Sequence, residues 1–437
     1  MMLPRQTPAR VLGLVASLAL AASALAQEFD AKIKREVLDE VQSTLTTRAY
    51  VGGVRFSQWK DHEAKYFDRL DAAGSPEAFA AVVNGALAEF GVSHAALIPP
   101  SMAGEGRASV VGIGVSVRFT NDGGLRVLRV LDDSPAAGAG LSPGDVIIQI
   151  DGAAPKDPAQ LEGEPDSKVE VRVRKLSGQR LDLSLTRRLI ITRTPATLTV
   201  FDESGSKVDL PPGARISDDR RLFGLIRLPT FANEYSQPEI KAIFRRCMGL
   251  SGLIIDLRDN GGGAVVYMQH FLSFLLIADQ PIGVAVSSEM AAQYVEATGG
   301  DPSDVVKVAA WSDDPITVPA NPIRPFPGPI VVLLNRGSAS ASELSAQALR
   351  ELHDAKICGH TSAGALLVSI TLPMPGNFVL QVPISDYVSA QGVRPEGVGI
   401  SPDIQPSRTP THPGLDPDVD AALNALLAET DPTRQNP

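Results

Sequence analysis

Between residues 221 and 353, short apolar segments alternate with amphipathic ones, and this alternation restricts the chain to few folds. The segments RLFGLIRLPTF (221–231), SGLIIDLR (251–258) and GPIVVLLN (328–335) have the composition of buried strands. QPEIKAIFRRCMG (237–249) and ASASELSAQALRELH (339–353) repeat apolar residues at helical spacing. Strands separated by helices predict a layered α/β domain.

The first 26 residues carry the pattern of an export signal. Arg5 and Arg10 form a short basic region before an apolar run, Val11–Ala26, which ends in the small-x-small sequence Ala24-Leu25-Ala26. The run is shorter than the roughly 20 residues of a membrane-spanning helix. We therefore expect cleavage of 1–26 and an exported protein, periplasmic or secreted, with an uncleaved signal anchor as the alternative.

Two further regions precede the α/β segment. Residues 27–104 contain FDAKIKREVLDEVQSTL and SPEAFAAVVNGALAEFG, which predict a helical region in which the second helix starts near Ser75 and stops at Gly91. Residues 105–190 change to strands and turns, with a hairpin expected where KVEVRVRK and QRLDLSLTRR meet. We assign 191–408 to the α/β domain and 409–437 to a C-terminal helix and tail.

Composition excludes some functions. A formal net charge of -10 with no Lys/Arg-rich block argues against a nucleic-acid partner. Cys247 and Cys358 form no CxxC pair and have no histidine cluster beside them, so they make a poor metal site. We expect two buried free thiols, although an exported protein would permit a disulfide between them.

Two stretches carry candidate chemistry. GSASASE places Ser338, Ser340 and Ser342 after a strand and at the start of a helix, where free N–H groups and the helix dipole favour a developing oxyanion. IIDLRDNGGG (254–263) ends a strand in three glycines, whose backbone can approach a reacting carbonyl closely. Helix capping by the serines and a simple tight turn are the alternatives.

Between residues 105 and 190, SPAAGAGLSPGDVIIQIDG (134–152) and the loop Gly112-Ile113-Gly114 resemble a PDZ domain, with an unrelated small β-domain as the alternative. In that family the loop N–H groups bind a peptide's terminal carboxylate, and the peptide adds as a strand to the sheet edge. With this segment, DLRDNGGG, GSASASEL and GVRPEGVGISPD resemble the C-terminal-processing (tail-specific) serine peptidases and their tricorn-like relatives.

The resemblance implies a multidomain α/β protein with an N-terminal helical region, a PDZ β-domain and a crotonase-like layered peptidase domain. It implies an endopeptidase that needs no metal or organic cofactor and acts on peptides or proteins, with free C-termini as one recognised feature. Ser340 would be the nucleophile, and the N–H groups of Gly262 (Gly261 as the alternative) and Ala341 would bind the oxyanion.

The general base is the open point. The best-known branch of the family uses a lysine in a GKG-like turn, but Ala365 stands at that place here, and Lys356 is the nearest lysine. By resemblance to the tricorn-like branch, His94 would be the base, with Ser93 orienting its ring and Glu396 polarising the array. His360 is the strongest competitor. With no working base, the chain would be an inactive PDZ peptide-binding scaffold; acyl chemistry on a non-peptide substrate is a further alternative.

Overall fold

The computed structural model describes residues 30–102, 109–120, 123–131, 134–191, 194–211, 220–407 and 409–431, so the predicted export signal lies outside the described residues. The chain divides into two compact units. The inserted unit comprises Gly106–Pro195, and the main unit comprises the chain before and after it. No helix in the described part of the chain has the length and apolarity to cross a membrane.

The main unit is built on a six-stranded sheet of order β10-β9-β11-β12-β15-β16. Strands β11, β12, β15 and β16 are parallel, and β9 and β10 are antiparallel additions at one edge. The three apolar segments of the sequence form the central strands, as predicted. The strands are β9 (Thr197–Asp202), β10 (Lys207–Val208), β11 (Leu222–Arg227), β12 (Gly252–Asp256), β15 (Ile330–Leu334) and β16 (Lys356–Gly359).

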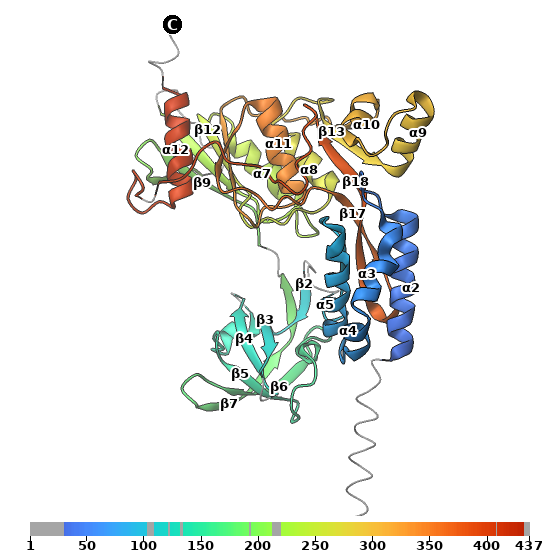
Figure 1. Cartoon of the computed structure of the whole chain (residues 1–437). Helices are drawn as coiled ribbons and strands as arrows, with labels where there is room; N and C mark the ends of the chain where they lie inside the picture. The colour runs from blue at the N-terminus through green and yellow to red at the C-terminus, as the bar shows by residue number, and fades with distance from the viewer. Residues whose placement is uncertain are drawn as a thin grey trace, which may run out of the picture. The chain divides into compact units, whose positions relative to one another are not determined.

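Helices cover both faces of this sheet, which explains why β12 and β15 are buried along their whole length. One face packs against apolar side chains of three helices, α7 (Gln237–Cys247), α8 (Val265–Leu272) and α11 (Ala341–His353). The opposite face packs against α12 (Pro417–Glu429), drawn in red in Figure 1. The predicted α/β layering is therefore confirmed, and the C-terminal helix forms part of it.

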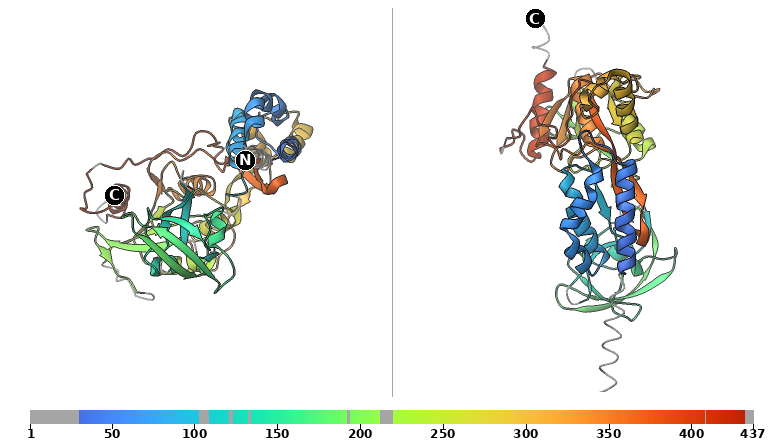
Figure 2. Two further views of the ribbon diagram at one scale, coloured as in Figure 1. Left: turned by 90° about the horizontal axis from the view of Figure 1, so that it is seen from below. Right: turned by 45° about the vertical axis from the view of Figure 1, so that its right-hand side comes forward.

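A second sheet joins the N-terminal helices to the rest of the main unit. Its strand order is β1-β18-β13-β14, and the long strand β18 pairs with β1, β13 and β17. The N-terminal helices pack beside β17 and β18 through one apolar core (Figures 1 and 2). The strands are β1 (Ala96–Ile98), β13 (Pro281–Ser287), β14 (Ile316–Thr317), β17 (Val368–Pro373) and β18 (Val379–Ser389).

The N-terminal helices follow the predicted pattern. Ser75 caps α5 by accepting a hydrogen bond from Ala78 N (3.2 Å), and Gly91 ends the helical stretch with φ 66°. The helices are α2 (Ala31–Arg48), η1 (Phe56–Gln58), α3 (Trp59–Lys65), α4 (Phe67–Ala72), α5 (Pro76–Leu87) and η2 (Ala88–Phe90). Elsewhere in this unit lie α9 (Ser288–Thr298), α10 (Val305–Trp311) and η4 (Pro375–Asn377).

The inserted unit is a five-stranded antiparallel sheet of order β3-β4-β5-β6-β7, closed by a two-stranded pair, β2-β8. The expected hairpin joins β6 to β7, and Gly178 takes φ 85° in its turn. The elements are β2 (Ser109–Gly112), β3 (Val115–Phe119), β4 (Leu125–Val130), α6 (Pro135–Gly138), β5 (Val146–Ile150), η3 (Pro158–Leu161), β6 (Lys168–Arg174), β7 (Arg180–Thr186) and β8 (Arg188–Ile191).

Candidate active site

Ser340 occupies a strained position between β15 and α11. Its φ of 55° and ψ of -122° lie in a region that a residue with a Cβ rarely adopts. The backbone N–H of Ser340 donates to Ala365 O (2.8 Å) and to Glu343 Oε2 (3.0 Å), which holds this conformation. Such strain is concentrated at functional sites, and a nucleophilic serine on a strand-to-helix turn is one known form of it.

The three serines of the motif have different environments. Ser338 donates its hydroxyl to Leu257 O, and Ser342 donates to Asn260 O (both 2.8 Å), so the two buried outer serines bind the neighbouring turn. The middle serine, Ser340, is half-buried and lines a cavity of about 110 Å³. Apolar side chains from α8, α11 and the segment before β17 form much of the wall: Val265, Leu344, Leu366 and Leu367.

The glycine turn that follows β12 packs directly against this serine. Gly262 has φ 93°, and a Cβ at this position would stand 2.7 Å from Ser340 Cβ and 2.9 Å from Ala341 N. The structure therefore brings Gly262, Ser340 and Ala341 together, whereas a Cβ on Gly261 would meet no atom within 4 Å. In this conformation the Gly262 N–H donates to Asn260 Oδ1 (2.9 Å), so it must leave that partner before it can bind an oxyanion.

Ser93, His94 and Glu396 form a second cluster. The Ser93 hydroxyl lies 2.7 Å from His94 Nδ1 and donates to Glu396 Oε2 (3.1 Å), and Ser93 N donates to Glu396 Oε1 (3.0 Å). The cluster forms because β1, which starts two residues after His94, pairs with β18, and the chain after β18 leads to Glu396.

The hydrogen bonds of this cluster fix the tautomer of the imidazole. A hydroxyl has one hydrogen, and the carboxylate takes it, so Ser93 Oγ must accept the hydrogen of His94 Nδ1. Nε2 of neutral His94 then carries the lone pair that a general base needs. Burial lowers the pKa of His94 below its usual value, and the charge of Glu396 partly opposes this shift.

Two buried carboxylates connect the cluster to Ser340 through successive N–H groups of one segment. Glu343 accepts hydrogen bonds from Gly364 N (2.7 Å) and Ala365 N (2.9 Å), and Glu396 accepts one from Leu366 N (2.7 Å). The Ser362 hydroxyl and Ser340 N also donate to Glu343. Burial raises the pKa of Glu343, and these hydrogen bonds partly offset the shift. In the described part of the chain, no hydrogen bond joins His94 to Ser340 directly.

Comparison with known proteins identifies both units. Residues 222–406 match the family model of peptidase family S41, and residues 111–185 match that of the PDZ domain. Residues 222–406 form an S41 peptidase domain.

Among the proteins similar to this chain, the chloroplastic C-terminal processing peptidase of Tetradesmus obliquus is 30% identical over 324 residues, which cover 71% of this chain and 61% of that protein. The carboxy-terminal-processing protease of Bartonella bacilliformis is 28% identical over 310 residues, covering 67% and 60%. The chain thus spans about three fifths of the length of these two relatives. A solved photosystem II D1 C-terminal processing protease matches with 24% identity and a TM-score of 0.45, covering 90% of this chain and 97% of that one.

Other candidate bases of the S41 domain have different surroundings. Lys356 is exposed at the start of β16 and pairs with Val331, whereas Ser340 follows the opposite end of β15. His360 is exposed, with its backbone N–H bonded to Leu334 O. The remaining histidines have other contacts. The ring of His62 lies 4.5 Å from that of Phe90, tilted by 43°, and the rings of three more form hydrogen bonds: His270 with Tyr235, His353 with Phe326 O and His412 with Asp420.

The PDZ unit carries a groove beside its predicted carboxylate-binding loop. The groove has a volume of about 290 Å³ and is lined by Gly112, Ile113 and Gly114, by β3 and by η3. Strand β3 is an edge strand, because β4 is its only partner among the described strands. A peptide strand can pair with this free edge while its last residue reaches the loop.

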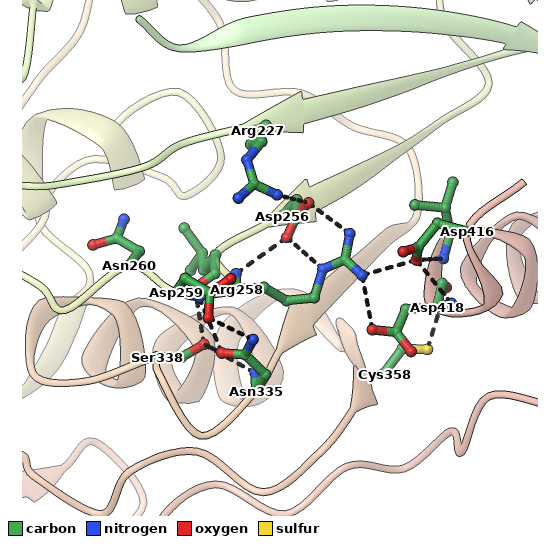
Figure 3. A network of polar contacts seen from close by, with 12 residues as sticks. Arg227, Asp256, Arg258, Asp259, Asn260, Asn335, Ser338, Cys358, Asp416 and Asp418 are labelled. Carbon is green, nitrogen blue, oxygen red and sulfur yellow. Dashed lines mark hydrogen bonds and ion pairs between the residues drawn. The ribbon is translucent and has the colours of Figure 1, made fainter. Parts of the chain in front are cut away.

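Arg258, in the DLRDNGGG motif, ties β12 to α12 (Figure 3). Its guanidinium donates to both oxygens of Asp256 (2.9 Å each), to Asp416 (2.8 Å) and to Asp418 (2.9 Å). Burial by itself would lower the pKa of the Arg258 guanidinium. The hydrogen bonds and negative charges of Asp256 and Asp416 outweigh the effect of burial, so the pKa of Arg258 is raised. Beneath α12, the Cys358 thiol lies 3.6 Å from Asp418 O.

Cys247 and Cys358 are both buried free thiols in the structure. Burial raises the pKa of each thiol to about 12, which makes both unreactive while their surroundings stay closed.

Sequence reasoning missed Glu343, Asn260 and Ser362 as site residues. The spacing Ser340-x-x-Glu343 matches a capping box, which could have directed attention to the carboxylate. The contacts of Asn260 and Ser362 depend on how loops from distant parts of the chain meet, and no local pattern announces them.

Proposed function

We propose that this chain is an exported serine endopeptidase in which Ser340 attacks a peptide carbonyl and forms an acyl-enzyme. His94 Nε2 takes the hydroxyl proton of Ser340, Ser93 and Glu396 hold the imidazole in the required tautomer, and the proton then passes to the leaving amine. Water releases the acyl group with His94 again acting as the base. The N–H groups of Ala341 and Gly262 stabilise the oxyanion.

One observation carries this proposal: a strained serine lies at a helix start, against a glycine turn, beside a cavity. The two-carboxylate connection from Ser340 to the Ser93–His94 pair supports His94 over the exposed His360. Hydrogen bonds between nucleophile and base often form only when substrate is bound, so the missing contact between His94 and Ser340 does not exclude the pair. The predicted signal in residues 1–26 and the groove of the PDZ unit support export and peptide binding.

Labelling with a fluorophosphonate probe tests the mechanism, because the probe reacts only with an activated serine. We expect the mature protein and its His360→Ala variant to label, and Ser340→Ala and His94→Ala to stay unlabelled. Loss of labelling in His360→Ala but not in His94→Ala would transfer the role of base to His360. A wild-type protein that stays unlabelled, while a control serine peptidase reacts, would favour a non-catalytic peptide-binding scaffold.

A further inference from the structure

The β3–β4 hairpin of the PDZ unit carries a row of arginines on its exposed face. Arg118 on β3 stands directly opposite Arg126 on β4, and Ser116 stands opposite Arg129. All three arginines are exposed. The apolar residues that alternate with them, such as Val117 and Val127, pack into the core. Like charges placed directly across a strand pair destabilise a sheet, so the arrangement needs another explanation.

The β6–β7 hairpin of the same sheet places opposite charges across from each other. On β6 and β7, Arg172 stands opposite Asp182 and forms an ion pair with it (2.6 Å). Within the described residues, no ion pair or hydrogen bond of a side chain engages Arg118, Arg126 or Arg129. Because the whole chain has a net charge of -10, this row is a local excess of positive charge.

The row lies along the edge where a peptide strand would bind. Arg129 lines the 290 Å³ groove together with Gly114, Val115 and Ser116. In an added strand, side chains alternate between the two faces of the sheet. If the last residue of a peptide points into the groove, the second and fourth residues from its end point to the face of Ser116 and Arg118. Ser116 is small, so the long side chain of Arg129 can reach across it.

We propose that the PDZ unit selects extended peptides with a free C-terminus and acidic side chains at the second and fourth positions from that end. Arg129 and Arg118 pair with these carboxylates, and Arg126 adds to the positive potential that attracts them. This inference rests on the proposed peptide-binding role of the unit, and it adds a preference that the resemblance to PDZ domains does not supply.

Binding of labelled peptides to the full chain tests the preference, in the Ser340→Ala background to prevent cleavage. Two peptides of equal length have free C-termini; at the second and fourth positions from that end, one carries Glu and the other carries Gln. Fluorescence anisotropy gives the Kd of each peptide at 50 and 500 mM NaCl. We expect the Glu peptide to bind more tightly by about two- to fivefold per contact at low salt, with the difference shrinking at high salt.

Charge exchange makes the test specific. Arg129→Ala should remove the two- to fivefold share of one contact and leave that of Arg118, whereas Arg180→Ala, which changes an exposed arginine of β7, should keep the whole preference. Arg129→Glu should prefer a peptide with Lys at the second position and Glu at the fourth, because Arg118 is unchanged. Equal binding of the Glu and Gln peptides would refute the acidic preference while leaving peptide binding intact. This result would follow if Asp122, Asp132 or Asp133, which lie outside the described residues, neutralise the charge of the three arginines.

Two other outcomes would overturn the peptide-binding role itself or the kind of ligand proposed. If neither peptide binds, the peptide-binding part of the proposed function fails together with the preference. If phosphatidylserine vesicles bind through Arg129 while the Glu peptide has no advantage over the Gln peptide, the row contacts an anionic lipid surface instead.

Discussion

Replacing Arg258 with alanine should detach α12 from the central sheet. The Arg258 side chain is 14% exposed and forms hydrogen bonds with three carboxylates, of which Asp256 is almost fully buried. Removing one partner of a buried ion pair costs about 3–5 kcal/mol, because the remaining charge stays buried. Arg227 also contacts Asp256 (3.0 Å) and would remain as its partner, so we expect the low end, about 3 kcal/mol.

Thermal denaturation and thiol labelling measure this effect in two independent ways. A loss of about 3 kcal/mol lowers the Tm of a unit with more than about 300 residues by about 4 °C. Cys358 lies beneath α12 and Cys247 does not, so a thiol reagent followed by peptide mapping should find Cys358 labelled faster in Arg258→Ala and Cys247 unchanged.

A matched control separates a buried ion pair from an exposed one. Lys307 pairs with Asp304 on the surface, its side chain is 71% exposed, and Lys307→Ala should change stability by about 0–1 kcal/mol. If Arg258→Ala has no larger effect than Lys307→Ala and Cys358 stays protected, the reasoning that Arg258 holds α12 is wrong.

Three further predictions concern the site itself. Glu343→Gln should slow fluorophosphonate labelling of Ser340 about a hundredfold, because the amide nitrogen of the glutamine would face N–H donors and Ser340 would shift. An unchanged labelling rate in a folded variant would show that Glu343 does not position Ser340. Burial lowers the pKa of His94, so its neutral form persists below the usual pKa of about 6.5. The labelling rate should therefore stay level from pH 8 to 6.5 and decline only below pH 6.5. A decline that begins near pH 7.5 would argue against His94 as the base. The same lowered pKa contributes stability above about pH 6.5 that is lost as the pH falls through the folded-state pKa. Gly262→Ala should lose labelling and at least about 1–2 kcal/mol of stability through its left-handed φ and the contact with Ser340 Cβ, whereas Gly261→Ala, which has open space, should resemble the wild type in both measurements.

Local patterns in the sequence predicted the elements well because local physics determines them. Ser75 and Gly91 marked the ends of a helical stretch through capping geometry, and the apolar runs at 251–258 and 328–335 became strands buried on both faces. The hairpin around Gly178 followed from alternation and a turn residue.

Long-range contacts were beyond local patterns. The pairing of β1 with β18 joins the N-terminal helices to the rest of the main unit, yet three residues of β1 carry no signal for a partner almost 300 positions away. The contribution of α12 to the central core was likewise missed, because its apolar face fits the sheet only after β12, β15 and β16 are assembled. The roles of Ser340, His94 and Glu396 stay predictions that labelling will test.

The insertion of the PDZ unit between two parts of the main unit affects the time at which the site can form during synthesis. Ser93 and His94 leave the ribosome early, but β18 and then Glu396 leave it about 300 residues later. A nascent or prematurely ended chain that lacks β18 has neither the strand that positions β1 nor the carboxylate that holds Ser93. If Ser340 cuts peptides as proposed, the growing chain cannot do so before Glu396 has been added, and other polypeptides in the producing cell are spared until then.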